Sequence, residues 1–146
     1  MKIYLLCSWG GHLQETLELR DAWGAYDYRF ITYVSERSIA LKEPKWLIAP
    51  PWKSIPKFLY TLAKTSIKIL FNRPDVLMST GMGYVDIFLF PLCKLLGVYT
   101  IYIESGANVE YVSGTANFVR KFCNKFIVRW EDLAEKIGAE YHGGIF

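Results

Sequence analysis

A turn rich in glycine and ending in histidine follows the first apolar segment of the chain. Residues 2–7 are predicted to form a buried strand, and residues 12–23 have a helical pattern. Ser8, Gly10 and Gly11 lie between these two elements, and His12 begins the second. All four suit a tight turn. Glycines let the backbone approach a ligand closely, and the free amides and dipole of a helix N-terminus favour a phosphate. The turn therefore predicts a phosphate site beside a titratable histidine, the usual general base near neutral pH.

Other interpretations of this turn stay open. A plain strand-to-helix connection, with His12 as the helix cap, is common in α/β folds. A dinucleotide-binding turn is disfavoured, because Leu13 and Gln14 stand where that fingerprint needs small residues.

A second turn of the same kind follows a strand predicted over 75–78 and precedes a helix predicted over 84–96. It contributes three candidate ligand-binding residues: Thr80, Gly81 and Gly83. The Thr80 hydroxyl and the amides after it are candidate donors to a phosphate or a hydroxyl group. Two such turns at one edge of a sheet would form two walls of one crevice. The alternative is a turn without a ligand.

An acidic residue follows the strand predicted over 99–103. Glu104 stands at the carboxyl end of that strand, where active sites of parallel sheets form, and Asn108 lies in the loop beyond it. Glu104 is a candidate to abstract a proton or to bind a sugar hydroxyl, and Asn108 to orient a ligand. The alternatives are a solvated loop acid and a turn-forming asparagine.

A basic amphipathic segment lies between Glu43 and Asp75, with no acidic residue between them. Its helix is expected over 54–71, with lysines on one face and apolar residues opposite, which is typical of a helix bound to an anionic membrane surface. Each lysine near such a surface adds about 1 kcal/mol of binding. The expected membrane-binding residues are Trp52, Lys53, Lys57, Phe58, Lys64 and Lys68. An ordinary helix packed on the sheet is the alternative, and both hold if the docked helix touches lipid at its edge.

Composition limits the possible classes of function. The 146 residues are enough for one domain, 1–146, and 52% of them are hydrophobic, which excludes a disordered chain. A net charge of +3 does not indicate a general nucleic-acid binder. Three widely spaced cysteines, Cys7, Cys93 and Cys123, lack the spacing of a metal site, so neither metal nor cofactor is expected. They favour a reducing compartment. No apolar run approaches the roughly 20 residues of a membrane-spanning helix.

The elements that must position these residues alternate along the chain. Further strands are expected over 28–34, 46–49 and 125–129, with a last one at 139–142. Further helices are expected over 115–123 and 131–137. Strands separated by helices pair in parallel through right-handed crossovers, so the sequence predicts a doubly wound, mainly parallel α/β sheet of the Rossmann-like kind.

Five segments in order along the chain together resemble a known family. They are residues 7–13, 73–81, 101–105, 126–130 and 141–146. They resemble the acceptor-binding subunit of the two-component N-acetylglucosaminyltransferase that performs the second step of dolichol-linked oligosaccharide synthesis, with bacterial relatives in capsule and exopolysaccharide assembly. A more distant resemblance is to the peptidoglycan enzyme that glycosylates lipid I.

The resemblance implies the N-terminal, acceptor-side half of a GT-B glycosyltransferase, active only as a heterodimer with a donor-binding partner chain. It implies inverting, metal-independent transfer from a UDP-sugar to a polyprenyl-diphosphate-linked sugar. Gly10, Gly11 and His12 match the loop thought to meet the acceptor diphosphate, and Glu104 matches the acidic residue after the fifth strand. Eukaryotic members begin with a membrane anchor; since none is seen here, peripheral attachment to the cytoplasmic face of the membrane is expected instead.

Two further hypotheses remain. The chain is a non-catalytic recruiter that brings a separate glycosyltransferase to the membrane, or it is a small nucleotide-binding domain on its own, which the missing glycine fingerprint disfavours. Ile145 and Phe146, at the end of the chain, are the expected contact with the partner.

Overall fold

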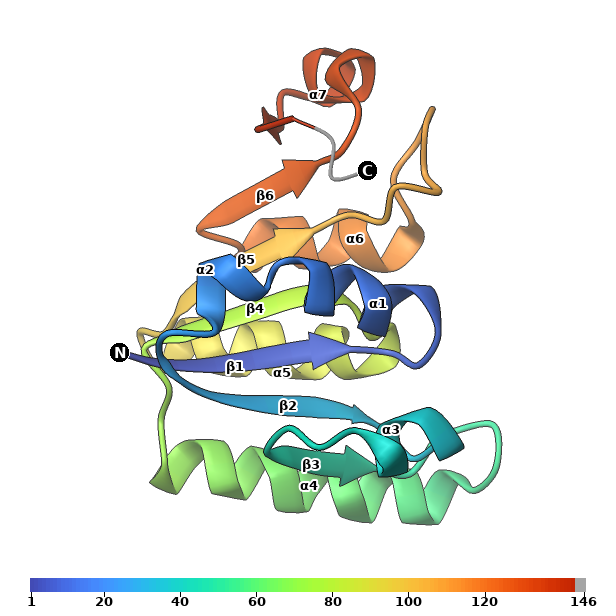
Figure 1. Ribbon diagram of the computed structural model, residues 1–146, viewed down its shortest axis with the longest axis vertical. Helices are drawn as coiled ribbons and strands as arrows, with labels where there is room; N and C mark the ends of the chain where they lie inside the picture. The colour runs from blue at the N-terminus through green and yellow to red at the C-terminus, as the bar shows by residue number, and fades with distance from the viewer. Residues whose placement is uncertain (144–146) are drawn as a thin grey trace.

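The computed structural model describes residues 1–143, and there the strands form one seven-stranded sheet in the order β3-β2-β1-β4-β5-β6-β7 (Figure 1). Every adjacent pair of strands is parallel. The strands are β1 (Lys2–Cys7), β2 (Asp27–Tyr33), β3 (Lys45–Ile48), β4 (Val76–Gly81), β5 (Tyr99–Ile103), β6 (Lys125–Val128) and β7 (Glu140–Tyr141). This arrangement confirms the predicted fold class.

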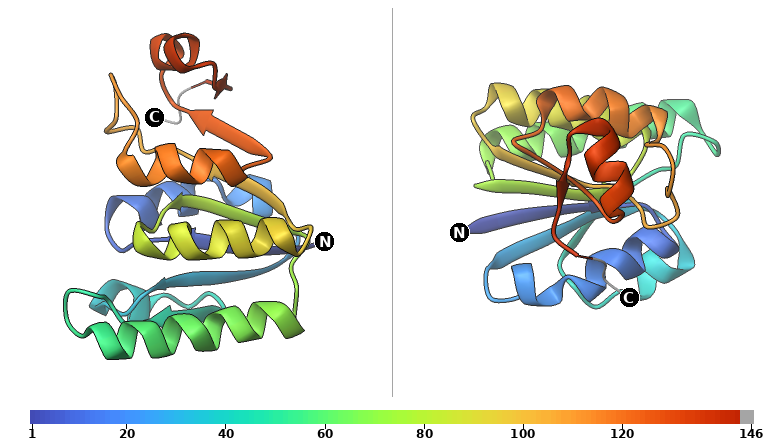
Figure 2. Two further views of the ribbon diagram at one scale, coloured as in Figure 1. Left: turned by 180° about the vertical axis from the view of Figure 1, so that it is seen from behind. Right: turned by 90° about the horizontal axis from the view of Figure 1, so that it is seen from above.

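Helices cover both faces of the sheet, as Figure 2 shows from above. On one face lie α1 (Gly11–Glu18), α2 (Arg20–Trp23) and α3 (Glu36–Ala40). On the other lie α4 (Ile55–Phe71), α5 (Tyr84–Leu95) and α6 (Gly114–Val119). A 3₁₀ helix, η1 (Arg120–Phe122), follows α6, and α7 (Glu131–Ile137) follows β6. The expected partner contacts Ile145 and Phe146 lie outside the described residues.

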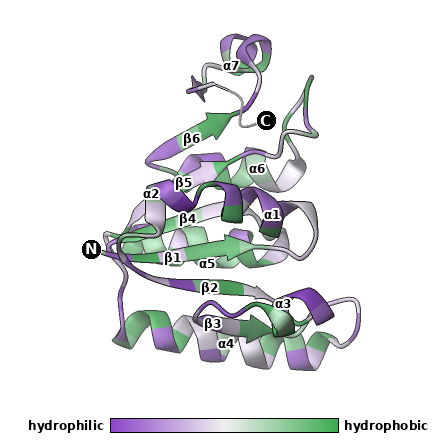
Figure 3. Cartoon of the chain, viewed as in Figure 1, coloured by the Kyte–Doolittle hydropathy of each residue, from purple (hydrophilic) through white to green (hydrophobic). Residues whose placement is uncertain are grey.

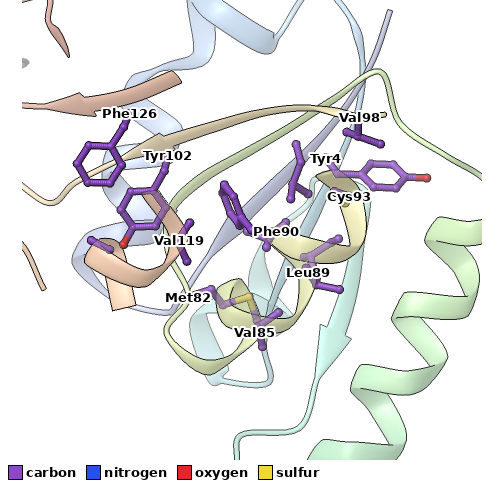
Figure 4. Close-up of a cluster of buried hydrophobic side chains, with 14 of the residues drawn as sticks. Tyr4, Met82, Val85, Leu89, Phe90, Cys93, Val98, Tyr102, Val119 and Phe126 are labelled. Atoms are coloured by element: carbon purple, nitrogen blue, oxygen red, sulfur yellow. The ribbon is translucent and has the colours of Figure 1, made fainter. Parts of the chain in front are cut away.

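The core is divided between the two faces because successive side chains of a strand point in opposite directions. From β1, Tyr4 and Leu6 join the larger cluster beneath α4 and α5, whereas Leu5 and Cys7 join the cluster beneath α1 and α2. Figure 4 shows the larger cluster around Phe90. In Figure 3 β1 is hydrophobic along most of its length, while α4 mixes both kinds of residue.

Two predicted helices differ from the structure. The helix expected over 12–23 is broken at Leu19, where the carbonyl of Thr16 accepts hydrogen bonds from the Leu19 amide, only three residues on, and from the indole of the buried Trp23. The helix expected over 115–123 runs from Gly114 to Val119 and then tightens into the 3₁₀ turn η1, a common end for a helix. The short helix α3, which the sequence analysis missed, begins with a capping box between Ser35 and Ser38.

Candidate functional site

A hollow of about 440 Å³ lies at the carboxyl ends of β1, β4 and β5. The strand order runs from β1 outward to β2 in one direction and to β4 in the other, so this edge is a topological switch point, where ligands bind in open α/β sheets. Six of the predicted catalytic and acceptor-binding residues line the hollow: Ser8, His12, Gly81, Gly83, Glu104 and Asn108. The structure thus brings both glycine turns and the acidic loop to one crevice.

The first turn places the His12 ring against the second turn. Gly10 has a φ of 85°, a conformation that favours glycine, and α1 begins at Gly11. Gly81 has a φ of 120°, and a Cβ at that position would lie 3.1 Å from two atoms of the His12 ring. Gly81 therefore provides both the backbone conformation and the space that this imidazole needs. Gly10 and Gly11 themselves lie outside the residues that line the hollow and set the start of α1.

The His12 ring is held by a carboxylate from its own helix. Glu15 Oε2 lies 3.4 Å from His12 Nδ1. The other oxygen, Glu15 Oε1, accepts hydrogen bonds from the Gly106 amide and the Ser105 hydroxyl, both at 3.2 Å. Glu15 was not predicted, although its place three residues after His12 puts both on one helix face. The carboxylate links the first turn to the loop after β5.

This contact changes the pKa of both groups. Glu15 raises the pKa of His12, and this increase exceeds the decrease that burial causes. Burial raises the pKa of Glu15, but His12, the Gly106 amide and the charge of Arg129 together lower it below its ordinary value. The neutral His12 imidazole is thus a stronger proton acceptor than an ordinary histidine, and the charged Glu15 carboxylate lies beside it.

Thr80 does not face a ligand, which corrects one prediction. Its side chain is 1% exposed, and its hydroxyl donates to the His12 carbonyl at 2.9 Å and lies 2.7 Å from the Thr16 hydroxyl. The hydroxyl is therefore used inside the protein, where it fixes the turn that carries His12.

The second turn is also satisfied from within. The Met82 amide donates to the buried carboxylate of Asp86, and the Gly81 amide donates to the Ser79 hydroxyl. Ser79 in turn donates to Asp86 at 2.7 Å. Contrary to the prediction, these two amides are not available to a phosphate. Burial raises the pKa of Asp86 to about 6. Asp86 was not predicted, because sequence alone does not show that an acid in the first turn of α5 points inward.

Glu104 lies in the hollow but is occupied by its own loop. It is 2% exposed and accepts hydrogen bonds from the Ser105 and Ser113 amides and from the Asn108 side chain. These contacts anchor the loop between β5 and α6. Asn108 is correspondingly held by Glu104, and it still contributes to the lining.

Exposed tryptophans form the rim of the hollow. The rings of Trp9 and Trp52 are 6.5 Å apart, and Trp52 packs edge-on against Tyr33 at 5.1 Å. Trp9 was not predicted. Aromatic rings with one apolar face exposed suit a ligand that is partly apolar.

Helix α4 packs one face on the sheet, which was the alternative to a membrane-bound helix, and leaves its other face exposed. Phe58 is 5% exposed and belongs to the core, so its predicted contact with a membrane is wrong. Lys57 and Lys64 are exposed, Lys53 precedes the helix, and Lys68 lies with its amine 4.8 Å from the centroid of the Trp46 ring. The helix is docked on the sheet while its outer face remains open. Within residues 1–143, no helix has the length and apolar character needed to cross a membrane.

The family match and two similar curated proteins indicate the same family. Residues 47–146 match the family described as oligosaccharide biosynthesis protein Alg14 like. The chain is 30% identical to the UDP-N-acetylglucosamine transferase subunit ALG14 of Candida albicans, over 82% of this chain and 57% of that one. It is also 30% identical to the subunit of the same name from Schizosaccharomyces pombe, over 92% of this chain and 78% of that one. The chain thus spans just over half the length of the Candida relative.

Two solved structures share the fold. Acinetobacter baumannii MurG superposes on all of this chain with a TM-score of 0.69 at 16% identity, and the match covers 46% of MurG. The UDP-GlcNAc 2-epimerase of Methanocaldococcus jannaschii superposes on 98% of this chain with a TM-score of 0.72 at 13% identity, covering 45% of the epimerase. The architecture is that of the N-terminal half of a GT-B protein.

Proposed function

Because the chain belongs to the Alg14-like family of oligosaccharide biosynthesis proteins, we propose that it is the acceptor-binding subunit of an inverting glycosyltransferase. A partner chain supplies the donor site, and together they transfer a sugar from a UDP-sugar to a polyprenyl-diphosphate-linked saccharide. The observation that carries this proposal is the His12–Glu15 pair in the crevice at the sheet's switch point.

The residues of the crevice have distinct roles in this reaction. The acceptor hydroxyl gives its proton to His12 as its oxygen attacks the anomeric carbon of the donor, and UDP leaves with the bonding electrons. Glu15 stabilises the imidazolium that forms. We assign the acceptor diphosphate to the first amides of α1, because the amides at the start of a helix lack partners within the helix. Glu104 keeps the loop that bears Asn108 in place, and no metal or cofactor takes part.

Attachment to the membrane belongs to the same proposal. Lys57 and Lys64 on the open side of α4 face an anionic bilayer surface, with exposed Tyr60 and Phe71 beside them. The subunit then works peripherally at the cytoplasmic face, where its acceptor lies in the bilayer.

The proposal is tested by a transfer assay with radiolabelled UDP-N-acetylglucosamine and vesicles containing a polyprenyl-diphosphate-linked sugar. The chain, the candidate partner, and both together are compared. Transfer that needs both chains supports a shared active site. Transfer by the partner alone, merely increased by this chain, would instead make the chain a membrane recruiter without catalytic residues.

Replacing Glu15 by glutamine is expected to move the pH dependence of transfer. Glu15 raises the pKa of His12, so its loss lowers that pKa, and the neutral imidazole then exists at lower pH. The acid limb of kcat/KM shifts to lower pH, and the plateau falls about 10- to 100-fold because the ring is less well oriented. Glu18→Gln, on the exposed side of the same helix, is the control and leaves the profile unchanged. An unshifted profile in Glu15→Gln would show that this pair does not set the working base.

A further inference from the structure

We propose that an apolar groove between α4 and α5 binds the first isoprene units of the acceptor's lipid tail. The inference rests on the proposed function, because it assumes a polyprenyl-diphosphate acceptor. It adds a binding site for the hydrocarbon part of that molecule, separate from the lysines that face the bilayer.

The groove has a volume of about 540 Å³, which is within the range of small-molecule sites. Its lining residues in the described chain are all apolar or aromatic: Pro51, Trp52, Ile55, Phe58, Leu59, Tyr84 and Phe88. Phe58 is buried and forms the floor of the groove. The walls are exposed to solvent, and their residues are between 51% and 64% exposed: Ile55, Leu59, Tyr84 and Phe88. Figure 2 shows α4 and α5 side by side on the same face of the sheet. A hydrocarbon chain would remove this apolar surface from water.

The groove is continuous with the candidate active site. Trp52 and Tyr84 line both the groove and the hollow that contains His12. The hollow offers polar groups such as His12 and Asn108, whereas the described side chains of the groove offer none but the Tyr84 hydroxyl and the Trp52 indole nitrogen, and the two share two aromatic walls. This arrangement matches a ligand whose polar head is covalently joined to a hydrocarbon tail. With the diphosphate near the start of α1, the tail passes between Trp52 and Tyr84 into the groove.

The size of the groove and its surroundings favour a lipid tail over a protein. A stable protein interface buries about 800 Å² on each partner, and this groove is formed by one turn of each of two helices and the loop before α4. Beyond it, α4 exposes more apolar residues, including Ile67 and Phe71, next to Lys64. The remainder of a long polyprenyl chain could thus continue into a bilayer that this surface touches.

The test measures binding without catalysis and without a membrane. Inorganic diphosphate and prenyl diphosphates with two and four isoprene units are titrated calorimetrically into the complex of this chain with its partner, below micelle-forming concentrations. We expect affinity to rise at least about tenfold when the tail is added. Leu59→Gln and Phe88→Gln should remove that gain while leaving the affinity for inorganic diphosphate unchanged. Ile67→Gln, an exposed apolar position on α4 outside the groove, is the matched control and should retain the gain.

Three results would overturn the inference. The first is equal affinity for inorganic diphosphate and for both prenyl diphosphates. The second is an increase in affinity with the tail that persists in both groove variants. The third is loss of the partner chain from those variants, which would make the groove a protein interface. Because the readout is binding, it can fail while the transfer assay succeeds. A failure of the proposed function is recognised separately, by the absence of transfer to any acceptor.

Discussion

Replacing His12 by alanine is expected to reduce sugar transfer about 10²- to 10⁴-fold, the usual contribution of a general base. The imidazole lies in the crevice against Gly81 and Glu15, on the turn that Thr80 fixes. Its removal deletes the proton acceptor but no core packing, so the chain should still fold and co-purify with its partner. The measurement is the initial rate of transfer by the purified complex, with its stoichiometry determined in parallel.

The chain offers a matched control, since it contains two histidines. His142 is exposed and pairs with Glu140 at the edge of the sheet, so His142→Ala should leave the rate unchanged. If His12→Ala keeps near-normal turnover, His12 is a turn residue. If the variant loses its partner, the residue has a structural role in assembly.

Replacing Asp86 by alanine is expected to lower the free energy of unfolding by about 2–5 kcal/mol, because two buried donors, the Met82 amide and the Ser79 hydroxyl, lose their acceptor. The same change releases the turn that contains Gly81, so transfer falls as well. Urea denaturation of the purified chain, followed by circular dichroism, measures the effect. Asp21→Asn, an exposed acid on α2, should be close to neutral. A midpoint unchanged in Asp86→Ala would mean that the network does not stabilise the fold.

The pH dependence of the free energy of unfolding gives a second test of Asp86. Burial raises the pKa of Asp86 from 3.8 to about 6. The folded state therefore binds this proton more tightly than the unfolded state. The contribution of Asp86 to the free energy of unfolding is present at low pH and is lost as the pH rises from about 4 through about 6. The loss amounts to about 3 kcal/mol at 1.36 kcal/mol per pKa unit. Asp86→Asn should remove this decline in stability, whereas a decline of the same size in that variant would assign it to another group.

The strands and both glycine turns could be predicted because their signals are local. Apolar runs bounded by turn residues define β1 and β4 regardless of what packs on them, and parallel pairing then places their carboxyl ends together. The break at Leu19 could not be predicted, since it depends on the burial of Trp23 and on its hydrogen bond to Thr16. Which face of α4 is buried depends in the same way on the neighbouring sheet, which is why Phe58 was misplaced.

The grouping of the candidate residues at one edge of the sheet could be predicted, but their hydrogen bonds could not. Residue type and spacing placed His12 and Glu104 at the same crevice. They did not show that Thr80 turns inward, that Asp86 binds the amides of the second turn, or that Glu15 reaches the loop after β5. The contacts of Thr80 with His12 and of Glu15 with Gly106 join residues 68 and 91 positions apart, so they follow from the tertiary structure. The contact of Asp86 with Met82 spans only four positions, but it depends on the inward direction of the Asp86 side chain.

The position of β1 inside the sheet, between β2 and β4, has a consequence for folding during synthesis. β1 pairs with β2 on one side, but its other neighbour is β4, where Ile3 lies opposite Val76. At about 5–20 residues per second, a ribosome needs several seconds to make the chain between β2 and β4. During that time one edge of an apolar strand has no partner and is open to aggregation. The crevice cannot exist before β4 arrives, so its two glycine turns are brought together by the same event that protects this edge.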